Sequence, residues 1–69
     1  MIKMTHVRSL YNKMLVTCYE SDGKFFVANQ HGDYDIFQGS CSQENRIGTV
    51  KANSPEMKAL IADYRKQGK

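Results

Sequence analysis

Long apolar runs are absent from this 69-residue chain, and so are runs of basic residues. No stretch approaches the ~20 consecutive apolar residues that a membrane-spanning helix needs. The N-terminal MIKMTHVRSLY also lacks the apolar core of a signal peptide. We therefore expect a cytoplasmic protein without a membrane partner, and its small size favours a bacterial or phage-encoded protein.

Metal-ligand patterns are absent as well. Cys18 and Cys41 are the two cysteines and His6 and His31 the two histidines, and all four are far apart in the sequence. Structural zinc sites usually depend on closely spaced pairs, so we predict no metal and no cofactor. In a reducing compartment both thiols are expected to be free. The alternative is a disulfide that closes a loop of roughly 20 residues.

Signatures of catalysis are equally sparse. The segment GSCSQENRIG lacks the Lys and Ser/Thr of a phosphate-binding loop. Cys41 could act as a nucleophile with His31 and Asp33 only if two separate loops met, and no spacing requires that. A chain this short buries only about 60% of its unfolded surface, which leaves little room for an enclosed pocket. We predict no catalytic residues and no small-molecule substrate.

The composition that remains is that of a globular domain. The chain is 41% hydrophobic and 25% charged with a single proline, which is too apolar for a disordered segment. We predict one compact domain over residues 1–69. The net charge of +3 makes the chain mildly basic, which permits an anionic partner without requiring one.

A helix is predicted over 55–66 in SPEMKALIADYRKQGK. Ser54 is a favourable N-cap and Pro55 suits the first helical position. The apolar residues recur at helical spacing and form one stripe that is expected to cover a sheet. The residues of this stripe are Met57, Leu60, Ile61 and Tyr64.

The middle of the chain predicts a β-meander. The Asp-Gly dipeptide at 22–23 is the strongest short hairpin signal. If these two residues form the turn, Tyr19 lies opposite Phe26 and Cys18 lies opposite Val27. Side chains alternate across a strand, so these two pairs lie on opposite faces of the sheet.

A second turn is predicted at the His-Gly dipeptide at 31–32. A two-residue turn there sets Val27 opposite Ile36 and Phe26 opposite Phe37. This register agrees with that of the first hairpin and continues both apolar rows. The sheet is therefore predicted to be apolar on both faces.

The ends of the meander complete the predicted fold. RIGTVKA, residues 46–52, is predicted to be the last strand. Residues 5–11 are predicted as a short helix or turn, followed by a strand over 14–20. The fold class is α+β: a small antiparallel sheet of about four strands with the C-terminal helix packed on one face.

The predicted helix can cover only one of the two apolar faces of the sheet. We predict that the helix packs on the more aliphatic face, because Asp35 then lies at the wet margin of the opposite face. The residues expected beneath the helix are Val16, Cys18, Val27 and Ile36.

The predicted function rests on the opposite, aromatic face of the sheet. Large apolar surfaces on small proteins are usually covered, here by the N-terminal segment, a second copy or a target. We predict a non-enzymatic protein-binding module of inhibitor or adaptor type that binds a protein partner or forms a homodimer. The alternative is a single-stranded nucleic acid whose bases stack on the same rings. The predicted contact residues are Tyr19, Phe26, Phe37 and Tyr34, with Lys24 and Arg46 on a charged rim.

Overall fold

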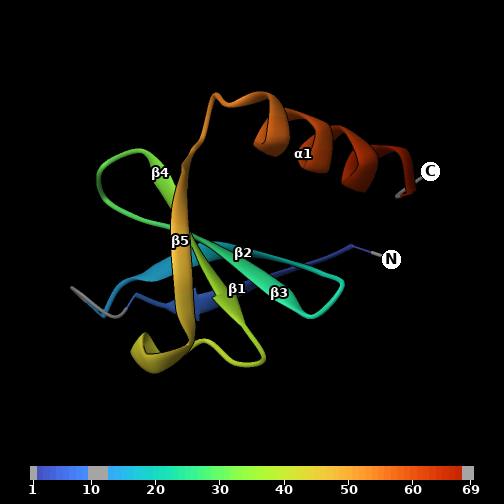
Figure 1. Cartoon of the computed structure of the whole chain (residues 1–69). Helices are drawn as coiled ribbons and strands as arrows, with labels where there is room; N and C mark the ends of the chain where they lie inside the picture. The colour runs from blue at the N-terminus through green and yellow to red at the C-terminus, as the bar shows by residue number, and fades with distance from the viewer. Residues whose placement is uncertain (1, 10–12, 68–69) are drawn as a thin grey trace.

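The computed structural model describes residues 2–9 and 13–67, which form an antiparallel meander followed by a helix (Figure 1). The sheet has five strands that are neighbours in chain order. The α+β class and the C-terminal helix are confirmed, whereas the sheet has one strand more than predicted. The elements are β1 (Lys3–Arg8), β2 (Leu15–Ser21), β3 (Lys24–Ala28), β4 (Asp33–Gln38), a 3-10 turn (Gln43–Asn45), β5 (Arg46–Lys51) and α1 (Pro55–Gln67).

The additional strand is β1, and it replaces the short helix or turn predicted over 5–11. Residues 5–8 are extended, and residues 10 and 11 lie outside the described residues. Thr5 and Val7 are β-branched and suit a strand. Pairing with β2 sets Val7 beside Val16, so a nonlocal contact overrides the local helical spacing.

The first hairpin has the predicted register. Tyr19 lies opposite Phe26 across β2 and β3. Asp22 and Gly23 have φ values of 52° and 80°. Two successive positive φ values are those of a type I′ turn, whose twist matches that of the flanking strands.

The second hairpin differs from the prediction by one residue. Phe26 lies opposite Ile36, and Val27 lies opposite Asp35. Because side chains alternate with a period of two, this shift exchanges every β4 side chain between the two faces. Phe37 therefore joins the face of Val27, and Ile36 joins the face of Phe26.

The shift arises because the turn is longer than two residues. The N–H of Asn29 donates to the carbonyl of Asp33 at 2.9 Å, so residues 30–32 form the loop. Gly32 has a φ of 81°. A left-handed residue at the end of a three-residue loop is a common hairpin geometry, and glycine adopts it without strain.

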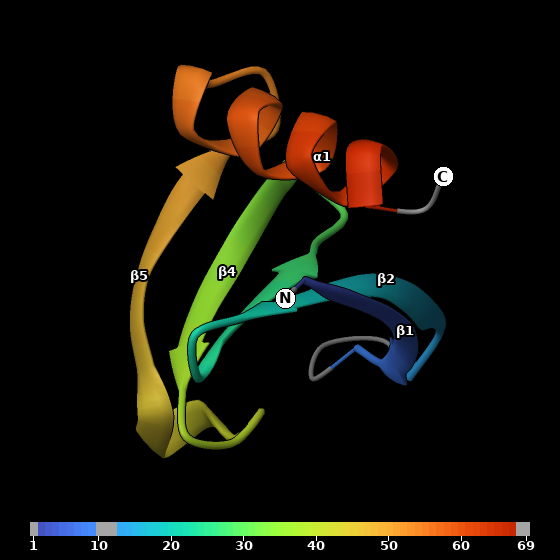
Figure 2. The same ribbon diagram turned by 90° about the vertical axis from the view of Figure 1, so that its right-hand side faces the viewer.

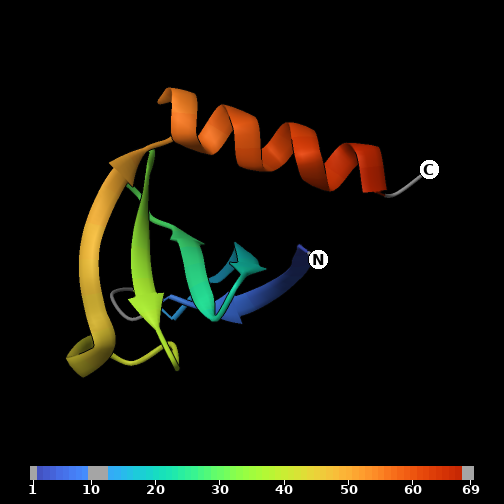
Figure 3. The same cartoon turned by 45° about the vertical axis from the view of Figure 1, so that its right-hand side comes forward.

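Helix α1 covers the aromatic face, so the predicted choice of inner face is wrong. The ring of Tyr19 lies 5.7 Å from that of Tyr64 on the helix and 6.1 Å from that of Tyr34. Phe26 and Met57 are buried on this side. Figure 3 shows α1 running from the end of β5 across the curved sheet toward the N-terminus.

The face away from α1 carries a second apolar cluster, so both faces are apolar as predicted. Its buried members are Cys18, Val27 and Phe37. The sheet is strongly curved, as the different directions of β1 and β5 in Figure 2 show. The partly buried residues packed against this cluster are Val7, Val16, Phe25 and Cys41.

The start of α1 is the predicted one. The N–H of Met57 donates to the Ser54 hydroxyl at 3.2 Å, which confirms Ser54 as the N-cap. Pro55 occupies the first helical position. Among residues 2–9 and 13–67, no helix combines the length and the apolarity required to cross a bilayer.

Candidate functional site

The residues predicted to form an aromatic contact surface do not share a surface. Phe26 is 5% exposed beneath α1, and Phe37 is 1% exposed on the opposite side of the sheet. Tyr19 and Tyr34 are half-buried and contact each other under the helix. Two features of the fold explain this. The longer second turn places Phe37 on the other face, and α1 covers the face that carries Tyr19 and Phe26.

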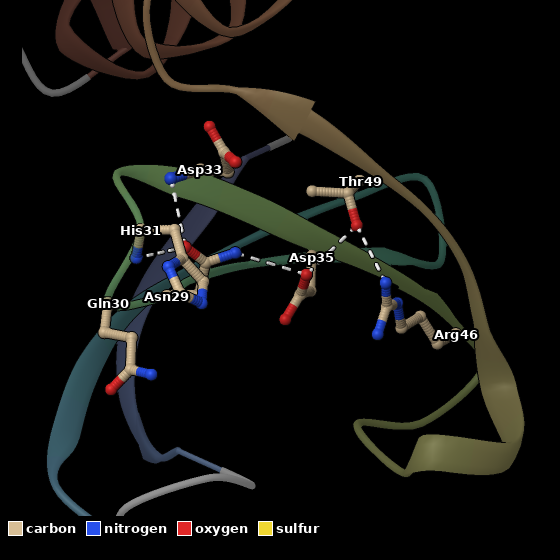
Figure 4. Close-up of a pocket in the computed structure, with 7 residues that line it drawn as sticks. All are labelled: Asn29, Gln30, His31, Asp33, Asp35, Arg46 and Thr49. Atoms are coloured by element: carbon tan, nitrogen blue, oxygen red, sulfur yellow. Dashed lines mark hydrogen bonds between the residues drawn. The ribbon is translucent and has the colours of Figure 1, made fainter.

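The two predicted rim cations are exposed, but they lie in different surroundings. Lys24 begins β3 and pairs with Gln38. Arg46 begins β5 and lines a polar pocket of about 330 Å³ on the face away from α1 (Figure 4). The residues that line this pocket are Asn29, Gln30, His31, Asp33, Asp35, Arg46 and Thr49.

A buried carboxylate lies at the centre of this pocket. Asp35 is 4% exposed, and its Oδ1 accepts hydrogen bonds from Asn29 Nδ2 at 3.3 Å and from Thr49 Oγ1 at 3.1 Å. Thr49 Oγ1 in turn accepts from Arg46 Nη2 at 3.2 Å (Figure 4). This network joins the β3–β4 turn to the edge strand β5.

Asn29 also shapes the turn that positions Asp35. Its Oδ1 accepts the N–H groups of His31 at 2.8 Å and Asp33 at 3.1 Å. Such a side-chain bond to the following backbone is typical of asparagine in turns. Asn29 therefore selects the long turn and supplies a donor to the carboxylate that this turn buries, which indicates a structural role for the network.

The pocket has no arrangement suited to a metal. Among the described residues, no group of three or more His, Cys, Asp or Glu side chains is placed to hold an ion. The side chains of Asn29, Asp35, Arg46 and Thr49 are engaged in the hydrogen bonds described above. The pocket is therefore better explained as the packing of one buried carboxylate than as a binding site.

The outer edge of β1 is a more exposed candidate. The N–H of Ser9 donates to the carbonyl of Met14 at 2.8 Å, which makes these two residues a hydrogen-bonded pair. Hydrogen-bonded and non-bonded pairs alternate along an antiparallel ladder. The backbone N–H and C=O groups of Met4, His6 and Arg8 therefore point away from β2. In the part of the chain that the structure describes, no strand pairs with this edge.

The backbone just before β1 is already paired. The N–H of Ile2 donates to Oε1 of Gln67 at 3.0 Å, and the carbonyl of Ile2 accepts from Nε2 of the same side chain. The Gln67 amide at the end of α1 thus occupies the place that a backbone amide of an added strand would take. This contact shows that the edge is accessible to a hydrogen-bonding partner.

The side chains of β1 give this edge a positive charge. Five of its six residues are exposed, and its sequence KMTHVR contains Lys3, His6 and Arg8 but no acidic residue. Arg8 lies opposite Leu15, which is 66% exposed, and Met14 beside it is 64% exposed. The edge therefore combines open backbone groups, positive charge and exposed apolar side chains. Sequence reasoning missed it because the helical spacing in this segment concealed the strand.

Comparisons with known proteins give no family for this chain: no protein-family model, curated protein or solved structure matches it significantly. Function must therefore be inferred from the geometry of the chain itself.

Proposed function

We propose that this protein is a small non-enzymatic protein-binding module that accepts an extended segment of a partner as an additional strand along β1. The observation that carries this proposal is the row of outward-facing backbone groups at Met4, His6 and Arg8, next to the position where Gln67 already pairs with Ile2. In strand addition, main-chain hydrogen bonds supply affinity and neighbouring side chains supply specificity.

The charge of β1 favours an acidic partner strand. Opposite charges on directly opposed residues stabilise a sheet, and like charges destabilise it. A second copy of this chain would bring another Lys3, His6 and Arg8 to an edge that has no acidic residue. Lysine on an edge strand often serves to discourage such self-pairing. We therefore favour an acidic segment of a different protein over the homodimer.

The burial of the aromatic rings counts against the nucleic-acid alternative. Stacking of unpaired bases requires exposed aromatic faces. Phe26 and Phe37 are interior residues, and Tyr19 and Tyr34 pack beneath α1. No exposed aromatic platform supports that alternative among the described residues.

Amide hydrogen exchange tests the proposal with a synthetic probe. The probe is a short peptide in which Glu alternates with Thr, and the control is the same peptide with Lys in place of Glu. We expect the Glu peptide to slow exchange at the N–H groups of Met4, His6 and Arg8 by about tenfold or more. Thr5 and Val7 should change little because their N–H groups already face β2. The Lys peptide should have no effect.

Two variants separate backbone pairing from charge attraction. His6→Pro removes one outward N–H and leaves the bonds to β2 in place, so the fold should persist while the peptide no longer binds. A double change, Lys3→Glu with Arg8→Glu, should reverse the preference between the two peptides. Protection spread over other surfaces, or equal protection by both peptides, would contradict the proposal. Slower exchange of the same amides at high protein concentration without peptide would favour the homodimer instead.

A further inference from the structure

Cys18 and Cys41 are separated in sequence but lie together in the cluster on the face away from α1. Cys18 is 1% exposed in the middle of β2, and Cys41 packs against the same cluster from the loop after β4. Both are free thiols in this structure, and each side chain lies near enough to the other to affect its pKa. The fold therefore brings the two cysteine side chains together in one cluster.

The surroundings of this pair disfavour negative charge. Burial, reinforced by the neighbouring Cys41, raises the pKa of Cys18 to about 11, and burial also raises the pKa of Cys41. Glu20 lies near enough to oppose ionisation of both thiols. A soft divalent metal ion would need more ligands than these two thiols, and among the described residues no group of three or more His, Cys, Asp or Glu side chains is placed to hold an ion. A disulfide needs only the two sulfur atoms and is neutral. The surroundings therefore suit a disulfide better than a thiolate–metal site.

The two thiols differ in solvent exposure, and this difference sets the order in which they react. Cys41 is the more exposed, so a small oxidant reaches it first. Burial raises the pKa of both thiols, so exposure is what separates them. Cys41 is thus the first nucleophile and Cys18 the resolving thiol.

We propose that Cys18 and Cys41 form an intramolecular disulfide when the protein meets a low-molecular-weight disulfide such as oxidised glutathione. Cys41 loses its proton and attacks one sulfur of that molecule, which breaks its S–S bond and releases one small thiol after proton uptake. Cys18 then loses its proton and attacks Sγ of Cys41, which releases the second small thiol. The two protein thiols are oxidised, and the small disulfide is reduced to two thiols.

This bond ties the loop after β4 to the middle of β2. It closes a loop of roughly 20 residues, and a disulfide over such a loop restricts the unfolded chain. For a domain of this size we expect the midpoint of thermal unfolding to rise by about 10–20 °C.

The test is oxidation of the full chain by glutathione disulfide, followed by mass spectrometry and thermal unfolding. We expect monomeric protein that has lost two hydrogen atoms and unfolds at the higher temperature, with both changes reversed by dithiothreitol. The rate should increase with pH and continue to rise above pH 9, the unperturbed cysteine pKa, because the pKa of the attacking thiol is raised.

Two single variants test the order of attack. Cys18→Ala should accumulate glutathione on Cys41, because the resolving thiol is absent. Cys41→Ser should remain unmodified, because the remaining thiol is buried. The proposal is overturned if the wild-type protein stays reduced, if it forms intermolecular dimers, or if oxidation leaves thermal unfolding unchanged. Stable glutathione on Cys41 of the wild-type protein would also overturn it.

Discussion

Replacing Phe37 by alanine is expected to lower the free energy of unfolding by about 3–5 kcal/mol, which is much of the stability of a domain this small. Phe37 is 1% exposed and packs with Cys18 and Val27 on the face away from α1. Truncation would remove a large apolar side chain and leave a cavity that a short sheet can fill only in part. Urea unfolding followed by circular dichroism measures the loss.

Two comparisons make this result specific to the observed packing. Leu15→Ala changes a residue that is 66% exposed and should alter the unfolding free energy by less than about 0.5 kcal/mol. Phe26→Ala should cost about as much as Phe37→Ala, because each ring is buried on its own face of the sheet. If Phe37 were instead a surface anchor, the Phe37→Ala protein would keep the stability of the wild type.

The features that the sequence predicts well are those decided by neighbouring residues. The Ser54 hydroxyl and Pro55 define the start of α1 whatever lies beneath the helix. The Asp-Gly turn at 22–23 likewise sets the register of β2 and β3 through its own backbone conformation. In both cases a few adjacent side chains carry the information, and the surrounding fold does not have to be known.

The second hairpin shows how one side chain can mislead the same reasoning. His31 and Gly32 resemble a two-residue turn, yet Asn29 accepts two backbone N–H groups and stabilises a loop over 30–32. The signal was present in ANQHGD, because an Asn before the loop and a Gly at its last position fit the longer hairpin loop. The shift by one residue then reversed the faces of Phe37 and Asp35.

The N-terminal strand and the choice of inner face depend on contacts between distant parts of the chain. Val7 and Met14 fit a helical spacing, and only pairing with β2 decides in favour of a strand. Both faces of the sheet offer apolar rows, so the position of α1 follows from where β5 ends and from contacts such as that of Tyr64 with Tyr19. Local sequence does not encode either outcome. The exposed edge of β1 was therefore hidden from the sequence-based prediction of function.

Asp35→Ala is expected to destabilise the protein by about 2 kcal/mol, because the partly buried Asn29 amide and the exposed Thr49 hydroxyl would both lose the buried carboxylate that accepts their hydrogen bonds. Asn29 Nδ2 and Thr49 Oγ1 both donate to the Asp35 carboxylate, which is 4% exposed. The predicted register had placed this carboxylate at a wet margin. There, its removal would change the unfolding free energy by less than about 0.5 kcal/mol, so the measurement distinguishes the two registers.

Asp35→Asn is the matched control for this second change. Its amide oxygen can still accept from Asn29 and Thr49, so the variant should lose less stability than Asp35→Ala, at about 1 kcal/mol. A double-mutant cycle with Asn29→Ala adds a further check. Because the two side chains are directly bonded, the combined loss should be smaller than the sum of the single losses by about 0.5 kcal/mol or more. Strict additivity would show that the carboxylate does not depend on the turn, and the role assigned to Asn29 in burying Asp35 would be wrong.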